Sequence, residues 1–139
     1  MRIGSRVSAL VAVALVSLLL PATTSSASAA GPCGSSYSRV GVYRIPETGT
    51  QDGTLEIYYS SSTGKNCALA YGVSAEHKGK RTYKGVAIRR AGGSGGWVGQ
   101  RDYFKYYAGP VYVSAPGTCI DAMGLMGGDD RYVWNVHCG

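Results

Sequence analysis

The sequence lacks several patterns that would assign it to a catalytic or metal-binding class. It holds only two histidines, His77 and His137, and a single phenylalanine among 139 residues. It has no C-x-x-C pair, a spacing that tetrahedral zinc sites normally use. The glycine-rich residues 91–99 (AGGSGGWVG) fit G-x-G-x-x-G in no register, and no helical pattern follows them to bind a nucleotide phosphate. We therefore expect no metal and no cofactor.

A hydrophobic run long enough to cross a membrane is also missing. The apolar residues 7–20 are fewer than the roughly 20 that a bilayer requires. They follow Arg2 and Arg6 and precede a small, polar stretch that contains an A-x-A pattern at residues 27–29, which is the layout of a secretory signal peptide. We predict a cleaved signal over residues 1–30 and a single domain over residues 31–139. The mature protein would be secreted and would keep no membrane anchor.

Convincing helical periodicity is absent from residues 31–139, whereas strand and turn signals are frequent. In TLEIYYS, Leu55, Ile57 and Tyr59 alternate with polar neighbours, and in CALAYGV the residues 67, 69, 71 and 73 share a face. With the turn SSTGKN between them, residues 54–73 predict a β-hairpin. Further strands are expected in residues 37–45, 82–88 and 110–114, in TCID and in RYVWNVHC, with residues 91–99 as a flexible loop and RDYFKYYA as a strand or a lid. The fold class is all-β: a small, disulfide-stapled antiparallel β-sandwich or barrel of about seven or eight short strands.

The four cysteines all follow the predicted signal, at Cys33, Cys67, Cys119 and Cys138. An even number in a short exported chain indicates two disulfides, because the compartment is oxidising and the core is small. Three pairings are possible, and the sequence does not decide among them. We favour the two sequential bridges, Cys33 with Cys67 and Cys119 with Cys138. Each would add roughly 3 kcal/mol by restricting the unfolded chain.

The net charge is +6, and about +4 remains after removal of the signal. Half of the remaining cations are close together in the sequence KGKRTYKGVAIRR, and such a cluster can attract wall polymers or other polyanions. A solvated basic face that only keeps the protein soluble is an equally good explanation, and nucleic acid is not an expected partner. The candidate basic patch consists of Lys78, Lys80, Arg81, Lys84, Arg89 and Arg90.

Aromatic residues are concentrated in the stretch that follows the glycine-rich loop. Tyrosine and tryptophan faces stack on sugar rings while their polar tips form hydrogen bonds, so an exposed row would suit glycan binding. The simpler alternative is that these rings fill the core and cover neighbouring strands. The candidate ligand-contacting aromatics are Trp97, Tyr103, Tyr106, Tyr107 and Tyr112, with Trp134 near the end of the chain.

The stretch YYAGPVYVSAPGTCIDAMG, residues 106–124, combines folding signals with candidate ligand contacts. Pro110 is expected to open a strand with Val111 and Val113 on one face, and Pro116-Gly117 has the central residues of a type II turn. A ligand site here would require one common exposed face. The side chains that would have to share that face are Tyr106, Tyr107, Tyr112 and Asp121.

Catalytic, calcium-binding and inhibitory alternatives have weaker support. A ribonuclease needs a carboxylate base, a histidine acid and arginines around one phosphate, and no spacing supports such a set. GGDDR, residues 127–131, could bind calcium but is explained by a tight turn. A protease inhibitor could use the loop near Trp97, although its five glycines argue against the rigid loop that inhibition needs. The residues that a nuclease could use are Glu56, His77, His137 and Arg89.

Two motifs resemble the spore-associated protein A family of small secreted actinomycete proteins. The family pattern has a Cys-Gly step after the signal, a T-G-K-N-C turn and a Y-A-G-P-V-Y-V/L-S-A-x-G-x-C-V/I-D block before a final cysteine. The matching residues here are Cys33-Gly34, residues 63–67, residues 107–121 and Cys138. The resemblance implies a secreted, disulfide-bonded protein found with aerial mycelium and spores, and it provides no catalytic residues. The basic residues 78–90 and Asp129-Asp130 are not part of the family pattern.

The combined prediction is a secreted, non-catalytic protein of the cell or spore surface. It would bind a wall or spore-surface polymer, such as a wall glycan, through aromatic and basic surface groups. The first alternative is a small secreted enzyme or toxin that acts on a polyanion, of the nuclease type. The second is a protease inhibitor.

Overall fold

The computed structural model describes residues 31–93 and 95–139, so the predicted signal peptide, residues 1–30, lies outside the described residues. Short antiparallel strands account for most of the described chain, as the alternating sequence pattern predicts. One turn of 3₁₀-helix, Ala91–Gly93, follows the fourth strand. The strands are β1 Ser38–Ile45, β2 Gly53–Ser60, β3 Lys65–Gly72, β4 Thr82–Arg90, β5 Val98–Phe104, β6 Tyr107–Ser114, β7 Ile120–Met126 and β8 Asp129–Val136.

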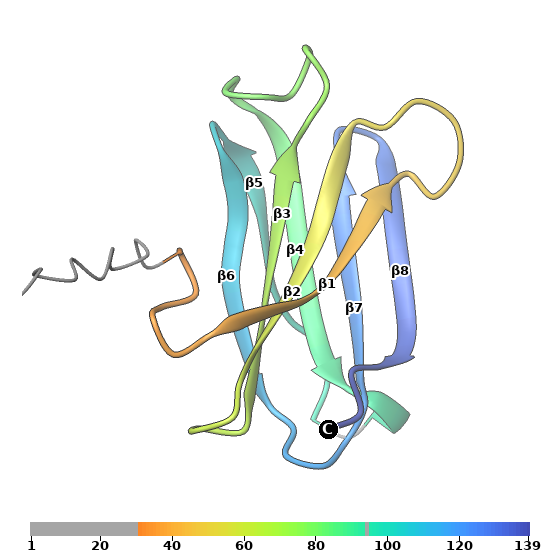
Figure 1. Cartoon of the computed structure of the whole chain (residues 1–139). Helices are drawn as coiled ribbons and strands as arrows, with labels where there is room; N and C mark the ends of the chain where they lie inside the picture. Colours follow the sequence, from red (N-terminus) through yellow and green to blue (C-terminus); the bar gives the residue numbers. More distant parts are fainter. Residues whose placement is uncertain (1–30, 94) are drawn as a thin grey trace, which may run out of the picture.

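The eight strands form two four-stranded sheets that pack face to face (Figure 1). The first sheet has the order β1-β2-β3-β6 and the second the order β5-β4-β7-β8. All pairings within the sheets are antiparallel. The expected all-β class is confirmed, and of the two expected architectures the sandwich is the one that fits, because the sheets do not close into a barrel.

Alternate residues of the strands fill the space between the sheets. Leu55 and Ile57 of β2 face Val86 and Ile88 of β4 and Ile120 of β7, and all five are almost completely buried. Burying one such side chain contributes about 1.5–3 kcal/mol. This core leaves the two outer faces of the sandwich to tyrosine, tryptophan and charged side chains.

The predicted β2–β3 hairpin is confirmed, but the face shared by Cys67, Leu69 and Tyr71 is the outer one. Ala68 and Ala70 point into the core instead. Cys67 and Leu69 are nevertheless buried, because the N-terminal segment around Cys33 and several tyrosines cover them. This strand is therefore buried on both faces, which explains its continuous apolar sequence.

The two cysteine bridges are the sequential pairs that the sequence analysis favoured. Cys33 is bonded to Cys67, which attaches the N-terminal segment to the outer face of β3. Cys119 is bonded to Cys138, which joins the start of β7 to the segment after β8. Each bridge thus attaches to the sandwich a segment that lies outside the strands.

Several strand boundaries differ from the sequence-based expectation. Strand β7 extends to Met126, beyond the expected TCID, and β8 begins at Asp129, two residues before the expected start. The expected loop over residues 91–99 ends earlier, because Val98 and Gly99 already pair with β4, and the following residues form strand β5 and not a lid. Strand β6 begins at Tyr107, three residues before Pro110, which was expected to open it. Proline is tolerated inside β6 because this strand lies at the edge of its sheet, and the register with β3 shifts beside it, between Ala68 and Ala70.

Within the described ranges, no helix has the length and apolar character needed to cross a membrane.

Candidate functional site

Three exposed aromatic rings meet on the outer face of the β5-β4-β7-β8 sheet. Tyr132 and Trp134 stack nearly parallel, with ring centroids 5.4 Å apart and an interplanar angle of 6°. The ring of Trp97 meets both edge-on, at 6.3 Å from Tyr132 and 6.0 Å from Trp134. The exposed fractions are 39% for Trp97, 42% for Tyr132 and 52% for Trp134. We refer to these three residues as the aromatic platform.

The strand pattern explains how the platform forms. Tyr132 and Trp134 are two residues apart on β8, so their side chains leave the same face of the sheet. Trp97 directly precedes β5, at the opposite edge of the sheet, and must reach across β4 and β7 to meet them. Two residues next to Trp97 on this face are small: Gly99 pairs with Ala87, and a β-carbon built on Gly99 would lie only 2.8 Å from that of Ala87.

Two hollows lie beside the platform. One, of about 150 Å³, is lined by Ala87, Trp97, Arg101, Met123 and Tyr132. The other, of about 300 Å³, shares Ala87, Trp97 and Arg101 with the first and continues over β5. The platform thus borders a shallow surface with aromatic walls and a cation at its margin, which is an arrangement suited to a ring-shaped polar ligand.

Arg89 supports the platform from the middle of the sheet. Its guanidinium carbon lies 4.6 Å from the ring centroid of Trp97 and 5.7 Å from that of Trp134. Its Nε donates a hydrogen bond of 2.9 Å to Asp121 Oδ2, and Asp121 Oδ1 accepts another, 3.0 Å long, from the backbone N–H of Asn135. The charge of Arg89 is therefore compensated by Asp121, while its flat surface holds the two tryptophans in place.

The aromatics predicted from the sequence do not form one row. Trp97 belongs to the platform, and Tyr103 lies on the same sheet against Tyr83, 5.4 Å away between ring centroids. Tyr106 is exposed in the β5–β6 turn, with Lys105 Nζ 5.3 Å from its ring centroid. Tyr107 and Tyr112 belong to the other sheet.

Tyr107 and Tyr112 belong to a tyrosine cover over Leu69 and the Cys33–Cys67 bridge. Tyr107 packs on Tyr71 at 5.2 Å between ring centroids. Tyr112 donates a hydrogen bond of 3.0 Å to the carbonyl of Cys33. Asp121, by contrast, is buried on the second sheet, so the common face that a site on residues 106–124 would require does not form.

The candidate basic patch is also divided. Lys84 is fully buried, and its Nζ donates to Lys80 O, Thr82 Oγ1 and Phe104 O over 2.7–2.8 Å. Burial lowers the pKa of Lys84. Arg89 serves the platform, and the nine-residue strand β4, which spans roughly 30 Å, separates the loop cations from Arg90. The loop cations are Lys78, Lys80 and Arg81.

The nuclease set is not assembled. His77 is buried, and its ring lies beside Gly127, the residue that follows β7 in the turn to β8. Its Nδ1 lies 2.8 Å from Thr82 Oγ1. His137 follows the other end of β8, so roughly 25 Å of strand separates the two rings. Glu56 accepts a 2.5 Å hydrogen bond from Tyr58 on the outer face of the first sheet, and Arg89 lies on the second sheet.

The acidic stretch at residues 127–131 forms a turn and the start of a strand. Gly127 and Gly128 connect β7 to β8, and Gly127 has a φ of 60°, which favours glycine. Asp129 and Asp130 are successive residues of β8 and so leave opposite faces of the sheet. In the described ranges no group of three or more His, Cys, Asp or Glu side chains is arranged to hold a metal ion.

Tyr132 was not among the aromatics predicted to contact a ligand, and Trp134 was noted only for its position. The missed signal is the alternation in RYVWNV, which places both rings on the face opposite Val133. Trp97 could be predicted as a candidate ligand contact because it is the only large apolar residue of its loop. Its contact with the aromatic residues of β8 could not be predicted, because that contact depends on the order of the strands in the sheet.

A curated relative decides the family. Over 120 residues the chain is 35% identical to the spore-associated protein A of Streptomyces coelicolor, and the match covers 85% of this chain and 73% of the relative. The chain belongs to the spore-associated protein A family. This result confirms the resemblance found in the sequence, and the relative's name refers to spores and to no enzymatic activity. No family profile matches the chain. No solved structure is similar enough to match.

Proposed function

We propose that this member of the spore-associated protein A family is a secreted, non-catalytic protein that binds glycans of the spore or cell wall through the aromatic platform. The observation that carries the proposal is the grouping of Trp97, Tyr132 and Trp134, three large rings that contact one another and remain exposed. Solvent-facing tryptophan and tyrosine present an apolar surface to a sugar ring and a polar tip to its hydroxyl groups.

The surroundings of the platform favour a sugar over a purely apolar partner. Arg101 lines both hollows and can donate hydrogen bonds to hydroxyl groups. Gly99 and Ala87 leave room above the sheet for a ring to lie flat. Because Asp121 compensates the charge of Arg89, most of the contact would be uncharged, so binding should depend only weakly on salt.

The test is retention of the purified protein on isolated cell wall and on spores, at low and at high salt. We expect retention in both, with the Trp97→Ala and Trp134→Ala variants each weakened about tenfold or more. Tyr106→Ala is the matched control, because Tyr106 is more exposed than either tryptophan but lies outside the platform. Equal loss in the control, or no retention of the wild-type protein at low salt, would contradict the proposal.

A further inference from the structure

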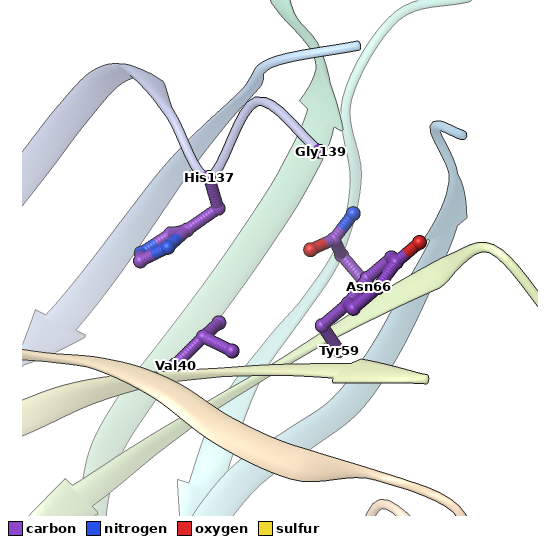
Figure 2. Close-up of a pocket in the computed structure, with 5 residues that line it drawn as sticks. All are labelled: Val40, Tyr59, Asn66, His137 and Gly139. Atoms are coloured by element: carbon purple, nitrogen blue, oxygen red, sulfur yellow. The ribbon is translucent and has the colours of Figure 1, made fainter. Parts of the chain in front are cut away.

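A second, separate pocket lies at the end of the sandwich where the chain finishes. It has a volume of about 130 Å³ and is lined by Val40, Tyr59, Asn66, His137 and Gly139 (Figure 2). Strands β1, β2 and β3 form one side of it, and the segment after β8 forms the other. None of these residues belongs to the aromatic platform, so this pocket does not depend on the proposed function.

Asn66 is the unusual member of the pocket. Asn66 is 1% exposed, and neither Nδ2 nor Oδ1 has a hydrogen-bond partner among the residues that the structure describes. In Figure 2 the carboxamide points from β3 toward the segment that carries His137 and Gly139, whereas the phenol oxygen of Tyr59 points away. Buried polar groups are almost always paired with protein or with ordered water, so both atoms of this amide are available to water or to a ligand.

The fold gives no reason for an amide at this position. Asn66 lies opposite Tyr59 and Val113, at the inward-facing end of β3, where the following inward residues are Ala68 and Ala70. Asparagine is a poor strand residue, and an apolar side chain of similar size would satisfy the strand and the core together. A residue that is unfavourable for folding, buried and directed into a pocket is expected to serve a ligand.

The opposite wall is held in place. Tyr43 Oη and His137 Nε2 lie 3.0 Å apart, within hydrogen-bonding distance, and the histidine ring packs edge-on against that tyrosine. Gly41 provides the space, because a β-carbon there would lie 2.5 Å from His137 Nε2. Burial lowers the pKa of His137, which favours the neutral form of the imidazole.

We propose that this pocket binds an uncharged carboxamide group. The Asn66 side chain offers an N–H donor beside a C=O acceptor, which is the complement of another amide: its Nδ2 would donate to the ligand carbonyl, and its Oδ1 would accept from the ligand N–H. Val40 provides an apolar contact for the carbon attached to that amide.

The size and charge of the pocket select this class of ligand. A volume of about 130 Å³ holds an amide with its methyl group but not a whole sugar ring, so the rest of a larger ligand would remain outside. No lysine or arginine lines the pocket to compensate a buried negative charge, which disfavours carboxylates. A primary amide can pair with Nδ2 and Oδ1 of Asn66 at the same time. The acetamido group of an amino sugar can pair with only one of these two atoms at a time.

The experiment is an NMR titration of the purified protein with acetamide, N-acetylglucosamine, acetate and glucosamine. We expect the first two to shift the side-chain amide signals of Asn66 and the ring signals of His137 at millimolar concentration. Acetate and glucosamine, which lack the amide, should require at least tenfold more. If N-acetylglucosamine binds at least tenfold tighter than acetamide, the ligand group belongs to an amino sugar. If acetamide binds at least tenfold tighter than N-acetylglucosamine, the ligand is a free amide. Equal shifts from all four probes would show binding without selectivity for an amide, and no shift from either amide would show a pocket filled only by water. Either result would overturn the proposal.

Variants separate this site from the platform. Asn66→Leu should abolish the response to both amides while leaving the thermal midpoint unchanged or higher, because it replaces unpaired polar atoms with apolar ones. Asn66→Ala provides the same test of binding if leucine does not fit. Trp134→Ala should keep the full response to acetamide, so a failure of the proposed function leaves this result intact. A lower midpoint for Asn66→Leu together with an unchanged acetamide response would overturn the assignment.

Discussion

Arg89 and Asp121 are paired across neighbouring strands, with Arg89 Nε donating to Asp121 Oδ2 over 2.9 Å at the point where β4 and β7 are in register. The carboxylate is almost fully buried, and its second oxygen accepts from the backbone of Asn135. The guanidinium lies beneath Trp97 and Trp134. One ion pair therefore connects the register of the second sheet to the support of the aromatic platform.

Removing this carboxylate should be costly. Asp121→Ala leaves Arg89 without its counter-ion and the Asn135 N–H without its acceptor, so we expect a loss of about 2–4 kcal/mol in the free energy of unfolding, measured by urea denaturation. Arg39→Ala is the matched control: it breaks an exposed ion pair with Glu56, 3.5 Å long, and should cost no more than about 1 kcal/mol. Equal effects of the two variants would contradict the structural role of Asp121.

Lys84 provides a second test of a buried cation. Its ammonium joins the β3–β4 loop to the end of β5 through Lys80 O and Phe104 O, so Lys84→Met should lower the free energy of unfolding by roughly 2–3 kcal/mol. The exposed Lys80→Met should change it by about 0.5 kcal/mol or less. If Lys84→Met were as stable as the wild-type protein, the three hydrogen bonds of Lys84 would contribute nothing net.

Local patterns allowed most of the fold to be predicted. Alternation in TLEIYYS and the turn SSTGKN placed the β2–β3 hairpin, because side-chain period and turn chemistry are short-range properties. Alternation did not show which face of β3 is the inner one, since Leu69 and Ala70 are both buried. The start of β6 was misplaced because the edge position that tolerates Pro110 depends on strand order, which is a long-range property.

The candidate sites depend more strongly on long-range pairing. Trp97 and Trp134 are far apart in the chain and meet because β5 and β8 belong to one sheet and both side chains lie over its outer face. The sequence cluster of cations dispersed for the same reason: Lys84 points into the core and Arg89 to the outer face. Asn66 gave no signal in the sequence, because an isolated asparagine next to a turn is ordinary until its burial is known.

The Cys119–Cys138 bridge should stabilise the end of the second sheet. Its removal by Cys119→Ser together with Cys138→Ser opens a loop with a sequence separation of 19, so we expect the free energy of unfolding to fall by roughly 3 kcal/mol. The Cys33→Ser, Cys67→Ser pair, with a separation of 34, should cost a similar amount and also release the segment that Tyr112 contacts. The rate of backbone hydrogen exchange around residues 33–37 should rise in the Cys33→Ser, Cys67→Ser variant and not in the Cys119→Ser, Cys138→Ser variant. The reverse pattern would contradict the assigned bridges.

The Tyr58–Glu56 hydrogen bond predicts a loss of stability at alkaline pH. Burial, together with that hydrogen bond, raises the pKa of Tyr58 from its ordinary value of 10.0 to about 12. Between these two values the unfolded chain has lost the phenol proton while the folded chain retains it, so folding is favoured fully below pH 10 and progressively less up to about pH 12. Unfolding in urea at a series of pH values should show this decline, and Tyr58→Phe should reduce it. An unchanged alkaline profile in Tyr58→Phe would mean that this phenol is not the group that titrates.

The lowered pKa of Lys84 acts in the opposite direction. The cost of burying its charge is relieved as the pH approaches 10.5, so the Lys84→Met variant should show a steeper alkaline loss of stability than the wild-type protein.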